Sequence, residues 1–271
     1  MKTIMRKMFP GRTLDMNKAM PDRRVPPVHE PFVTSYRGNH NGVLQCYISY
    51  NQYGGYCIPH ASYHRPAAQK VLAGEVWEPD TIKFMAEHSG GGDIVHAGAY
   101  FGDFIPALSL ACARNAKLWA FEPNPENYRC ALITLLINDL KNVELRNAGL
   151  GTQSGSISMQ ITDENGSALG GGSRFVVEDV KIKPELLTKV DVAKLDEVLP
   201  VERHVSIIQL DVEGFEQPAL MGAMETIKRC KPILILENCP EPDWLAENIL
   251  SLGYRISGNL HKNTVFAPNE P

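Results

Sequence analysis

The pattern of hydrophobic and polar positions changes at about residue 93. Beyond it, short apolar runs alternate with longer segments whose apolar residues recur every three or four positions. Short apolar runs are typical of buried strands, and the longer period is typical of helices that cover them. The alternation predicts parallel strand–helix–strand units in an α/β fold. We expect strands at 93–98, 117–123, 142–149, 205–214, 232–238, 254–258 and 263–268, and helices at 102–115, 124–140, 215–229 and 243–252.

This alternation stops between Gly151 and Asp191. Residues 154–162 and 174–183 alternate polar and apolar side chains, and the glycine-rich segment 165–173 lies between them. Strict alternation is typical of strands with one exposed face. The sequence therefore predicts an antiparallel β insertion at 151–191 within the larger domain.

The N-terminal region has a different composition. Residues 1 to about 45 are rich in Pro, Arg, His and Asn and show little periodicity, which favours an extended arm. We divide the chain into residues 1–78, a region that covers a substrate or contacts a second copy of the chain, and 79–271, the main domain. Within and just after the first region we expect a β-hairpin with aromatic side chains at 43–50 and 54–59, and helices at 66–74 and 78–88.

Composition excludes several classes of protein. Of 271 residues, 44% are hydrophobic and 21% charged, which is typical of a globular protein. The net charge of -4 argues against a nucleic-acid partner, which requires clustered Lys and Arg. No apolar run approaches the ~20 residues that cross a bilayer, and the first residues lack the apolar run of a signal peptide. We expect a cytoplasmic protein with no membrane partner.

The cysteines also favour a cytoplasmic protein. No pair has the C-x-x-C spacing of a zinc or redox site, and a chain of this length does not depend on disulfides. We expect six reduced thiols, of which three fall in predicted helices and should be buried there. The six are Cys46, Cys57, Cys112, Cys130, Cys230 and Cys239, and the three in helices are Cys112, Cys130 and Cys230.

A turn with two glycines follows the first of the parallel strands. Gly98 and Gly102 carry no Cβ, so a ligand can approach the backbone between strand and helix. The N-terminus of the following helix offers free N–H groups to a carboxylate or phosphate. A tight strand-to-helix turn without a ligand is the alternative explanation of the same glycines.

A carboxylate ends the second parallel strand. Glu122 lies 20 positions after Gly102, about the spacing at which an acid accepts ribose hydroxyls in nucleotide sites of this kind. The alternative is that Glu122 caps the helix that starts near Pro125. The turn lacks the G-x-G-x-x-G spacing of a pyrophosphate site, and no Tyr-x-x-x-Lys pair is present near the fourth strand. A nicotinamide dehydrogenase is therefore disfavoured.

Further acids follow the apolar strand 205–210 and its neighbour. Asp211, Glu213 and Glu216 come after the first strand, and Glu237 ends the next one. Because ligands bind beyond the carboxyl ends of parallel strands, these acids could provide a general base, a metal site or contacts to a cationic ligand. Neighbouring carboxylates raise each other's pKa, which suits a base. Glu213 and Glu216 could instead favour the N-terminus of the next helix.

Taken in order, four motifs resemble the FkbM family of S-adenosylmethionine-dependent methyltransferases. They are HAGAYFG, FEPNP, LDVEG and LILEN, and the resemblance extends from about Asp93 to Asn238. It implies a Rossmann-like class I methyltransferase fold, with a seven-stranded, mostly parallel sheet and an antiparallel last strand. It also implies S-adenosylmethionine as cofactor and O-methylation of a hydroxyl on a sugar or secondary metabolite.

The resemblance also implies roles for individual residues. Gly98, Ala99 and Gly102 would line the methionine part of the cofactor, Glu122 would bind the ribose, and Asn147 and Ala148 would lie near the adenine. Two residues depart from the family pattern, His96 in place of an acid and Tyr100 in place of an asparagine, and Asp103 is the candidate substitute acid. The implied cofactor-binding set is His96, Gly98, Ala99, Tyr100, Gly102, Asp103, Glu122, Asn147, Ala148 and Asp211, and the implied catalytic set is Asp211, Glu213 and Glu237.

Methyl transfer to a hydroxyl needs an in-line arrangement and a base within hydrogen-bond reach. Besides the acids, His60 and His64 are candidate bases, and the hairpin with the loop near Gly170 would cover the cleft. No resident metal is favoured, but the catalytic acids could hold Mg²⁺ in a metal-assisted variant.

A non-catalytic binder or scaffold of the same fold is the remaining alternative function. The expected partners are a small hydroxylated acceptor and a second copy of the chain, through the N-terminal arm.

Overall fold

The computed structural model describes residues 43–176 and 182–269. The chain divides into two units, Met1–Val43 and Leu44–Pro271, and the elements below belong to the second. The predicted N-terminal arm and part of the strand expected at 174–183 lie outside the described residues.

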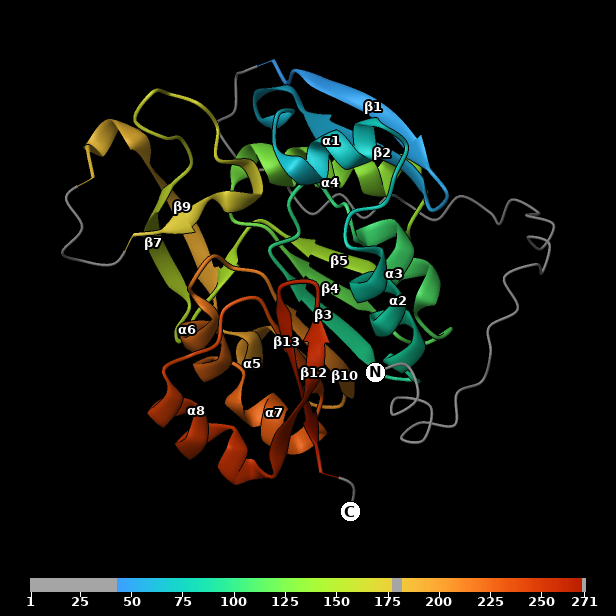
Figure 1. Ribbon diagram of the computed structural model, residues 1–271, viewed down its shortest axis with the longest axis vertical. Helices are drawn as coiled ribbons and strands as arrows, with labels where there is room; N and C mark the ends of the chain where they lie inside the picture. Colours follow the sequence, from blue (N-terminus) through green and yellow to red (C-terminus); the bar gives the residue numbers. More distant parts are fainter. Residues whose placement is uncertain (1–42, 177–181, 270–271) are drawn as a thin grey trace. The chain divides into compact units, whose positions relative to one another are not determined.

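A seven-stranded sheet forms the centre of this unit (Figure 1). Its strands are β3 (Asp93–Ala97), β4 (Leu118–Phe121), β5 (Val143–Arg146), β10 (Val205–Leu210), β11 (Ile233–Leu236), β12 (Tyr254–Leu260) and β13 (Asn263–Pro268). They lie in the order β12-β13-β11-β10-β3-β4-β5. The five strands from β11 to β5 are parallel, and the last strand of the chain, β13, is antiparallel to β11. This arrangement confirms the predicted fold class.

Both faces of the sheet are covered, which explains why its inner strands β3, β4, β10 and β11 are mostly apolar and buried. Val95 and Phe121 point to one face, where they pack with α5 to α8, whereas Ile94 and Leu118 point to the other, where they pack with α2 to α4. The helices are α2 (Pro79–His88), α3 (Ile105–Ala111), α4 (Pro125–Ile137), α5 (Leu195–Val198), α6 (Glu216–Met221), α7 (Met224–Cys230) and α8 (Pro242–Asn248), the last followed by the 3₁₀ turn Leu250–Leu252.

Two helices differ from the sequence prediction. The helix expected at 102–115 is only Ile105–Ala111, and it starts beside Pro106, which fits a first helical turn because its missing N–H would be unpaired there. The helix expected at 215–229 is interrupted between α6 and α7. A Cβ at Gly222 would lie 2.0 Å from the carbonyl oxygen of Gly151, so only glycine fits at this break, where the backbone passes close to the β insertion.

The β insertion forms a second, four-stranded sheet in the order β6-β9-β7-β8. Strand β7 is antiparallel to both β8 and β9, as its alternation of polar and apolar residues indicates. The glycine run forms a 3₁₀ turn at Gly170–Gly172. The strands are β6 (Gly149–Leu150), β7 (Gly155–Gln160), β8 (Arg174–Phe175) and β9 (Leu187–Ala193), with a further 3₁₀ turn at Pro184–Leu186 before β9.

The predicted aromatic hairpin packs on helix α4. Strands β1 (Cys46–Asn51) and β2 (Gly54–Pro59) pair antiparallel, and the 3₁₀ turn His60–Ser62 and helix α1 (Pro66–Leu72) follow. The Cys57 amide donates to Thr134 Oγ1 at 3.0 Å, which fastens β2 to α4. Residues 44–78 therefore belong to the same compact unit as the sheet. The role of residues 1–78 as a substrate cover or subunit contact stays a prediction.

The state of the cysteines and the lengths of the helices can also be compared with the predictions from the sequence. All six cysteines are free. Cys130 and Cys230 are buried in helices as predicted, but Cys112 is only half-buried because α3 ends one residue before it. Among the helices that the structure describes, none combines the length and the hydropathy needed to cross a bilayer.

Candidate active site

Residues that follow neighbouring parallel strands meet at the carboxyl edge of the sheet. Gly98 follows β3, Glu122 follows β4 and Asp211 follows β10, and all three line one small cavity. The β insertion closes the cavity from the opposite side, through the Gly170–Gly172 turn and Phe175. Its volume is about 20 Å³, which is room for about one water molecule.

The two glycines of the first turn are needed for packing within the chain. Gly98 has φ +90°, and a Cβ there would lie 1.9 Å from the carbonyl oxygen of Asp211. Gly102 has φ +87°, and its Cβ would lie 3.3 Å from the Thr134 side chain on α4. A tight turn thus accounts for both residues. Only Gly98 lines the cavity, and contact of either glycine with a ligand stays a prediction.

The Glu122 carboxylate links the first two turns. Its Oε2 accepts a hydrogen bond from the Tyr100 amide at 2.7 Å, and its Oε1 accepts one from the Asn124 amide at 2.8 Å. Burial raises the pKa of Glu122 to about 8, although these N–H donors oppose the shift. Helix α4 is capped by Asn124, whose Oδ1 accepts from the Glu126 amide at 3.0 Å. The alternative that Glu122 is the helix cap is therefore wrong.

Tyr100 joins the first turn to the hairpin region. Its backbone has φ +48°, a left-handed conformation that the hydrogen bond to Glu122 helps to hold. Its phenol donates to Ser62 Oγ at 2.7 Å, and the ring is buried against Phe101. Tyr100, one of the two departures from the family pattern, thus binds the Glu122 carboxylate through its main chain and does not line the cavity.

His96 and Asp103 lie behind the cavity in the core. The His96 ring is parallel to Phe104 at 5.3 Å, its Nδ1 is hydrogen-bonded to Gln209, and its Nε2 is buried with no partner among the described residues. Burial lowers the pKa of His96 to about 4, so the imidazole is neutral. Burial and the Glu78 carboxylate raise the pKa of Asp103 to about 7. Neither residue lines the cavity.

The other predicted cofactor residues lie just beside the cavity. The amide of Ala99 donates to the Phe121 carbonyl at 3.0 Å, which shapes the first turn. Asn147 Nδ2 donates to the carbonyl of Glu122 at 2.8 Å and so holds the turn after β4. Ala148 is buried, and its neighbour Gly149 lines the cavity.

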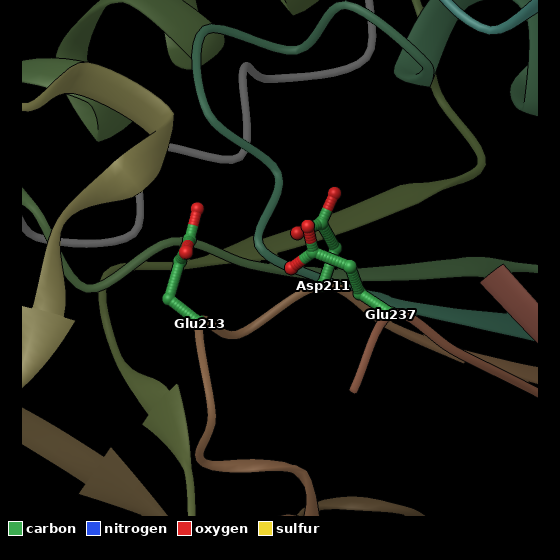
Figure 2. A group of neighbouring side chains, drawn as sticks. All are labelled: Asp211, Glu213 and Glu237. Carbon is green, nitrogen blue, oxygen red and sulfur yellow. The ribbon is translucent and has the colours of Figure 1, made fainter. Parts of the chain in front are cut away.

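The three predicted catalytic acids come together in space. Asp211, Glu213 and Glu237 each place one carboxylate oxygen within 4.8 Å of the other two, and Figure 2 shows Asp211 and Glu237 adjacent, with Glu213 farther away. Burial and the Glu237 carboxylate hold the pKa of Asp211 well above its usual range and raise that of Glu213. In the described ranges no Lys, Arg or His forms an ion pair with any of the three. Together they form an acidic group, although the charges of Arg65 and Lys262 oppose the raised pKa of Glu213.

Glu216 is separate from this group. It is buried, and its Oε1 accepts a hydrogen bond from the Val212 amide at 3.3 Å at the start of α6. In this fold Glu216 therefore supports the start of helix α6, as the alternative interpretation of the sequence expects.

Sequence reasoning missed the residues that close the cavity. Asn127 Nδ2 donates to the Gly170 carbonyl at 3.2 Å, and Asn124 Nδ2 donates to Ser173 Oγ at 3.1 Å. These bonds fix the glycine turn against the start of α4, close to Glu122. The glycine run was a visible signal for a turn, but nothing in the sequence indicates that Phe175 fills space beside Glu122.

A larger cavity lies on the other side of the same turn. Its volume is about 330 Å³, and Gly170 lines both cavities. The candidate base His64 lines it together with Glu126, whereas His60 does not line it and stacks on Tyr47 at 5.3 Å. The larger cavity is therefore bounded by the end of the hairpin, the start of α4 and the β insertion.

Comparison with known proteins agrees with the motifs at these strand ends. The sequence model of the Methyltransferase FkbM domain matches residues 96–256, more than half of the chain. The chain belongs to the FkbM methyltransferase family. No protein with a curated description matches it.

Solved structures of methyltransferases are remotely similar to this FkbM chain. Methyltransferase FkbM from Methylobacillus flagellatus KT is 19% identical, with a TM-score of 0.45 over 65% of this chain and 43% of that one. The tRNA (uracil-54, C5)-methyltransferase of Pyrococcus abyssi is 14% identical, with a TM-score of 0.43 over 82% and 43%. A SAM dependent methyltransferase from Aquifex aeolicus is 15% identical, with a TM-score of 0.40 over 75% and 93%. The chain spans less than half the length of the first two.

Proposed function

We propose that this FkbM-family protein transfers a methyl group from S-adenosylmethionine to a hydroxyl of a small polar molecule. Family membership supports methyl transfer. The observation that carries the proposal is that Gly98, Glu122 and Asp211 line one cavity at the carboxyl ends of β3, β4 and β10. A carboxylate at the end of the second strand is the usual acceptor for ribose hydroxyls in sheets of this kind.

The chemistry of the residues present fits this donor. Asp211, Glu213 and Glu237 are grouped without an ion-pair partner among the described residues, and carboxylates that lie this close together are stabilised by a neighbouring cation. S-adenosylmethionine supplies a methyl group on a positively charged sulfur and also carries an ammonium group. A ligand with two positive charges and a ribose therefore complements a lining of carboxylates.

The chain's own residues would orient the reactants and remove a proton. Glu122 would accept the ribose hydroxyls, and the rigid strand ends would hold the reacting atoms in line. A cation beside Asp211 lowers its pKa, so the Asp211–Glu237 pair would carry a free carboxylate oxygen. That oxygen could accept the proton of the acceptor hydroxyl.

The larger cavity supports a small polar acceptor, such as a sugar or a hydroxylated metabolite. Its volume of about 330 Å³ lies within the usual range of small-molecule sites, roughly 300–1,000 Å³. Polar side chains dominate its lining, and the exposed His64 offers a second candidate base. These polar side chains are Ser62, His64, Asn124, Glu126, Asn127, Thr162 and Ser167.

Replacement of the ribose acceptor tests the proposal. Each hydrogen bond from the ribose to Glu122 would contribute about 0.5–1.5 kcal/mol, so loss of two of them in Glu122→Ala should weaken S-adenosylhomocysteine binding by roughly 10- to 100-fold in calorimetry. Glu126→Ala, which removes a carboxylate from the larger cavity only, is the matched control and should bind normally. Unchanged affinity in a folded Glu122→Ala protein would contradict the assignment.

A Mg²⁺-assisted reaction is the second candidate, favoured by the close approach of three carboxylates. Mg²⁺ binds carboxylates and waters, and a bound ion could orient a diol acceptor. Calorimetric titration with Mg²⁺ separates this candidate from the metal-free reaction. Only the metal-assisted reaction requires that Mg²⁺ bind to the protein and that Glu213→Gln weaken this binding. A donor-binding protein without catalysis would bind S-adenosylhomocysteine but methylate no acceptor.

A further inference from the structure

The cavity at Glu122 is too small for the donor proposed above. Small-molecule sites usually measure roughly 300–1,000 Å³, whereas this cavity measures about 20 Å³. One side is formed by the strand ends and the other by the Gly170–Gly172 turn, Ser173 and Phe175. Binding of a nucleoside beside Glu122 therefore requires one of these sides to move.

The Phe175 ring lines the cavity beside Glu122. Its ring lies against the bare backbone of Gly149, where a Cβ would be 2.2 Å from Phe175 Cζ. It also packs on Phe215, with ring centroids 4.5 Å apart. Pro123 and Met159 line the same space, so the slot next to Glu122 is apolar and suited to a purine as well as to a phenyl ring.

The insertion is the side that can move with the loss of fewer contacts. Strands β3, β4 and β10 form a continuous parallel ladder in the buried core. The glycine turn is attached to α4 by the two side-chain hydrogen bonds from Asn124 and Asn127. Arg174 and Phe175 also pair with β7, so displacement of the segment breaks this two-residue ladder and the two bonds to α4 but leaves the central sheet intact.

We propose that the segment Gly170–Phe175 occupies the donor site of the free protein and is displaced when the donor binds. This inference rests on the proposed function, because it assumes that the adenosine lies beside Glu122. Gly170 also forms part of the wall of the 330 Å³ cavity, so displacement of the turn joins the two cavities. Donor binding would then open the acceptor side, which makes the donor the first ligand to bind.

Removal of the Phe175 ring tests the proposal directly. Donor binding to Phe175→Ala no longer has to expel a packed aromatic ring, so S-adenosylhomocysteine should bind about tenfold more tightly than to the wild type in calorimetry. Val190→Ala is the matched control, since Val190 is buried in β9 of the same insertion but does not line the cavity. Its affinity should not change. Equal or weaker binding by Phe175→Ala overturns the proposal, and weaker binding would mean that the ring stacks on the nucleoside.

Hydrogen exchange on the unaltered protein provides a second test that does not depend on a variant folding. The amides of Gly172 and Ser173 donate to Leu169 and Gly170 at 3.0 and 3.2 Å within the turn. Saturating S-adenosylhomocysteine should increase their exchange rates if the turn detaches, and slower exchange overturns the proposal. If neither the wild type nor Phe175→Ala binds S-adenosylhomocysteine, the proposed donor site falls. If the wild type binds and Phe175→Ala binds no better, only this inference falls.

Discussion

Several ionisable side chains at the carboxyl edge of the sheet have pKa values displaced toward the neutral form. Burial lowers the pKa of His96 to about 4, raises that of Asp103 to about 7 and raises that of Glu122 to about 8. Burial and Glu237 also hold the pKa of Asp211 well above its usual range. Each shift has the same cause, since a charge is poorly solvated inside the protein. A cationic ligand at this edge would reverse the shifts of the acids.

Donor binding should therefore release a proton from Asp211. The positive sulfur and ammonium of S-adenosylmethionine lower the pKa of Asp211, so binding becomes tighter as the pH rises. Calorimetry in buffers of different ionisation enthalpy at pH 7 measures the released protons. The release should fall in Asp211→Asn and with S-adenosylhomocysteine, whose sulfur is neutral. Equal release by Asp211→Asn and wild type would rule out Asp211 as the source.

His96 should make the fold less stable in acid. Its pKa is about 4 in the folded chain and 6.5 in the reference state, so the unfolded chain binds the proton more tightly. The stability contributed by neutral His96 is complete above pH 6.5 and is lost as the pH falls toward 4, by roughly 3 kcal/mol. Urea unfolding of His96→Leu between pH 7 and 4 should show a shallower decline than wild type. The exposed His64→Leu is the control and should keep the wild-type slope.

At the scale of elements, the turn between β3 and α3 is shaped by its contacts with other strands and helices. Gly98 passes the Asp211 carbonyl after β10, and Tyr100 binds Glu122 after β4. The strand–turn–helix pattern was predictable because its hydrophobic period is local. The shortening of α3 and the break between α6 and α7 were not predictable, and the break lies at Gly222, which approaches Gly151 across the structure.

Substitution of Gly98 should destabilise the turn far more than substitution of another left-handed glycine. Gly98→Ala adds a Cβ 1.9 Å from the Asp211 oxygen to an unfavourable φ, and we expect a loss of roughly 2–5 kcal/mol in unfolding free energy. Gly166 has φ +79° but open space around it, so Gly166→Ala should cost only about 1 kcal/mol. Chemical denaturation of both variants measures the difference. Similar losses would show that backbone conformation alone requires Gly98.

For the molecule as a whole, the carboxyl and amino ends of the strands in the central sheet differ in composition and contacts. The carboxyl edge contains the acids and cavities, whereas the amino edge is held by an ion pair between a buried acid and a partly exposed arginine. Asp93 at the start of β3 pairs with Arg203 and accepts hydrogen bonds from Trp119 Nε1 and the Lys117 amide, each at 2.8 Å. The network connects β3 to β4 and to the loop before β10.

Loss of the Asp93 charge should reduce global stability without altering the donor site. Asp93→Asn leaves the partly exposed Arg203 without its charged partner, and we expect a loss of about 1–3 kcal/mol in unfolding free energy. Glu225 forms an exposed pair with Lys228, so Glu225→Gln should change stability by less than about 1 kcal/mol. Thermal unfolding compares the two, and S-adenosylhomocysteine affinity of the folded Asp93→Asn protein should match the wild type. Weaker donor binding by that variant would show that the two edges are coupled.

The sequence alone determined the α/β class, the parallel strands, the family and the acids that end the strands, because each depends on a local period or a short motif. Only the tertiary structure decided which of these residues meet. Asn127 and Gly170 are 43 positions apart, yet their hydrogen bond helps to close the cavity beside Glu122. Likewise, the tight packing of Gly98 on Asp211 and of Phe175 on Gly149 is invisible in a linear pattern, since each arises where the sheet, α4 and the β insertion are packed together.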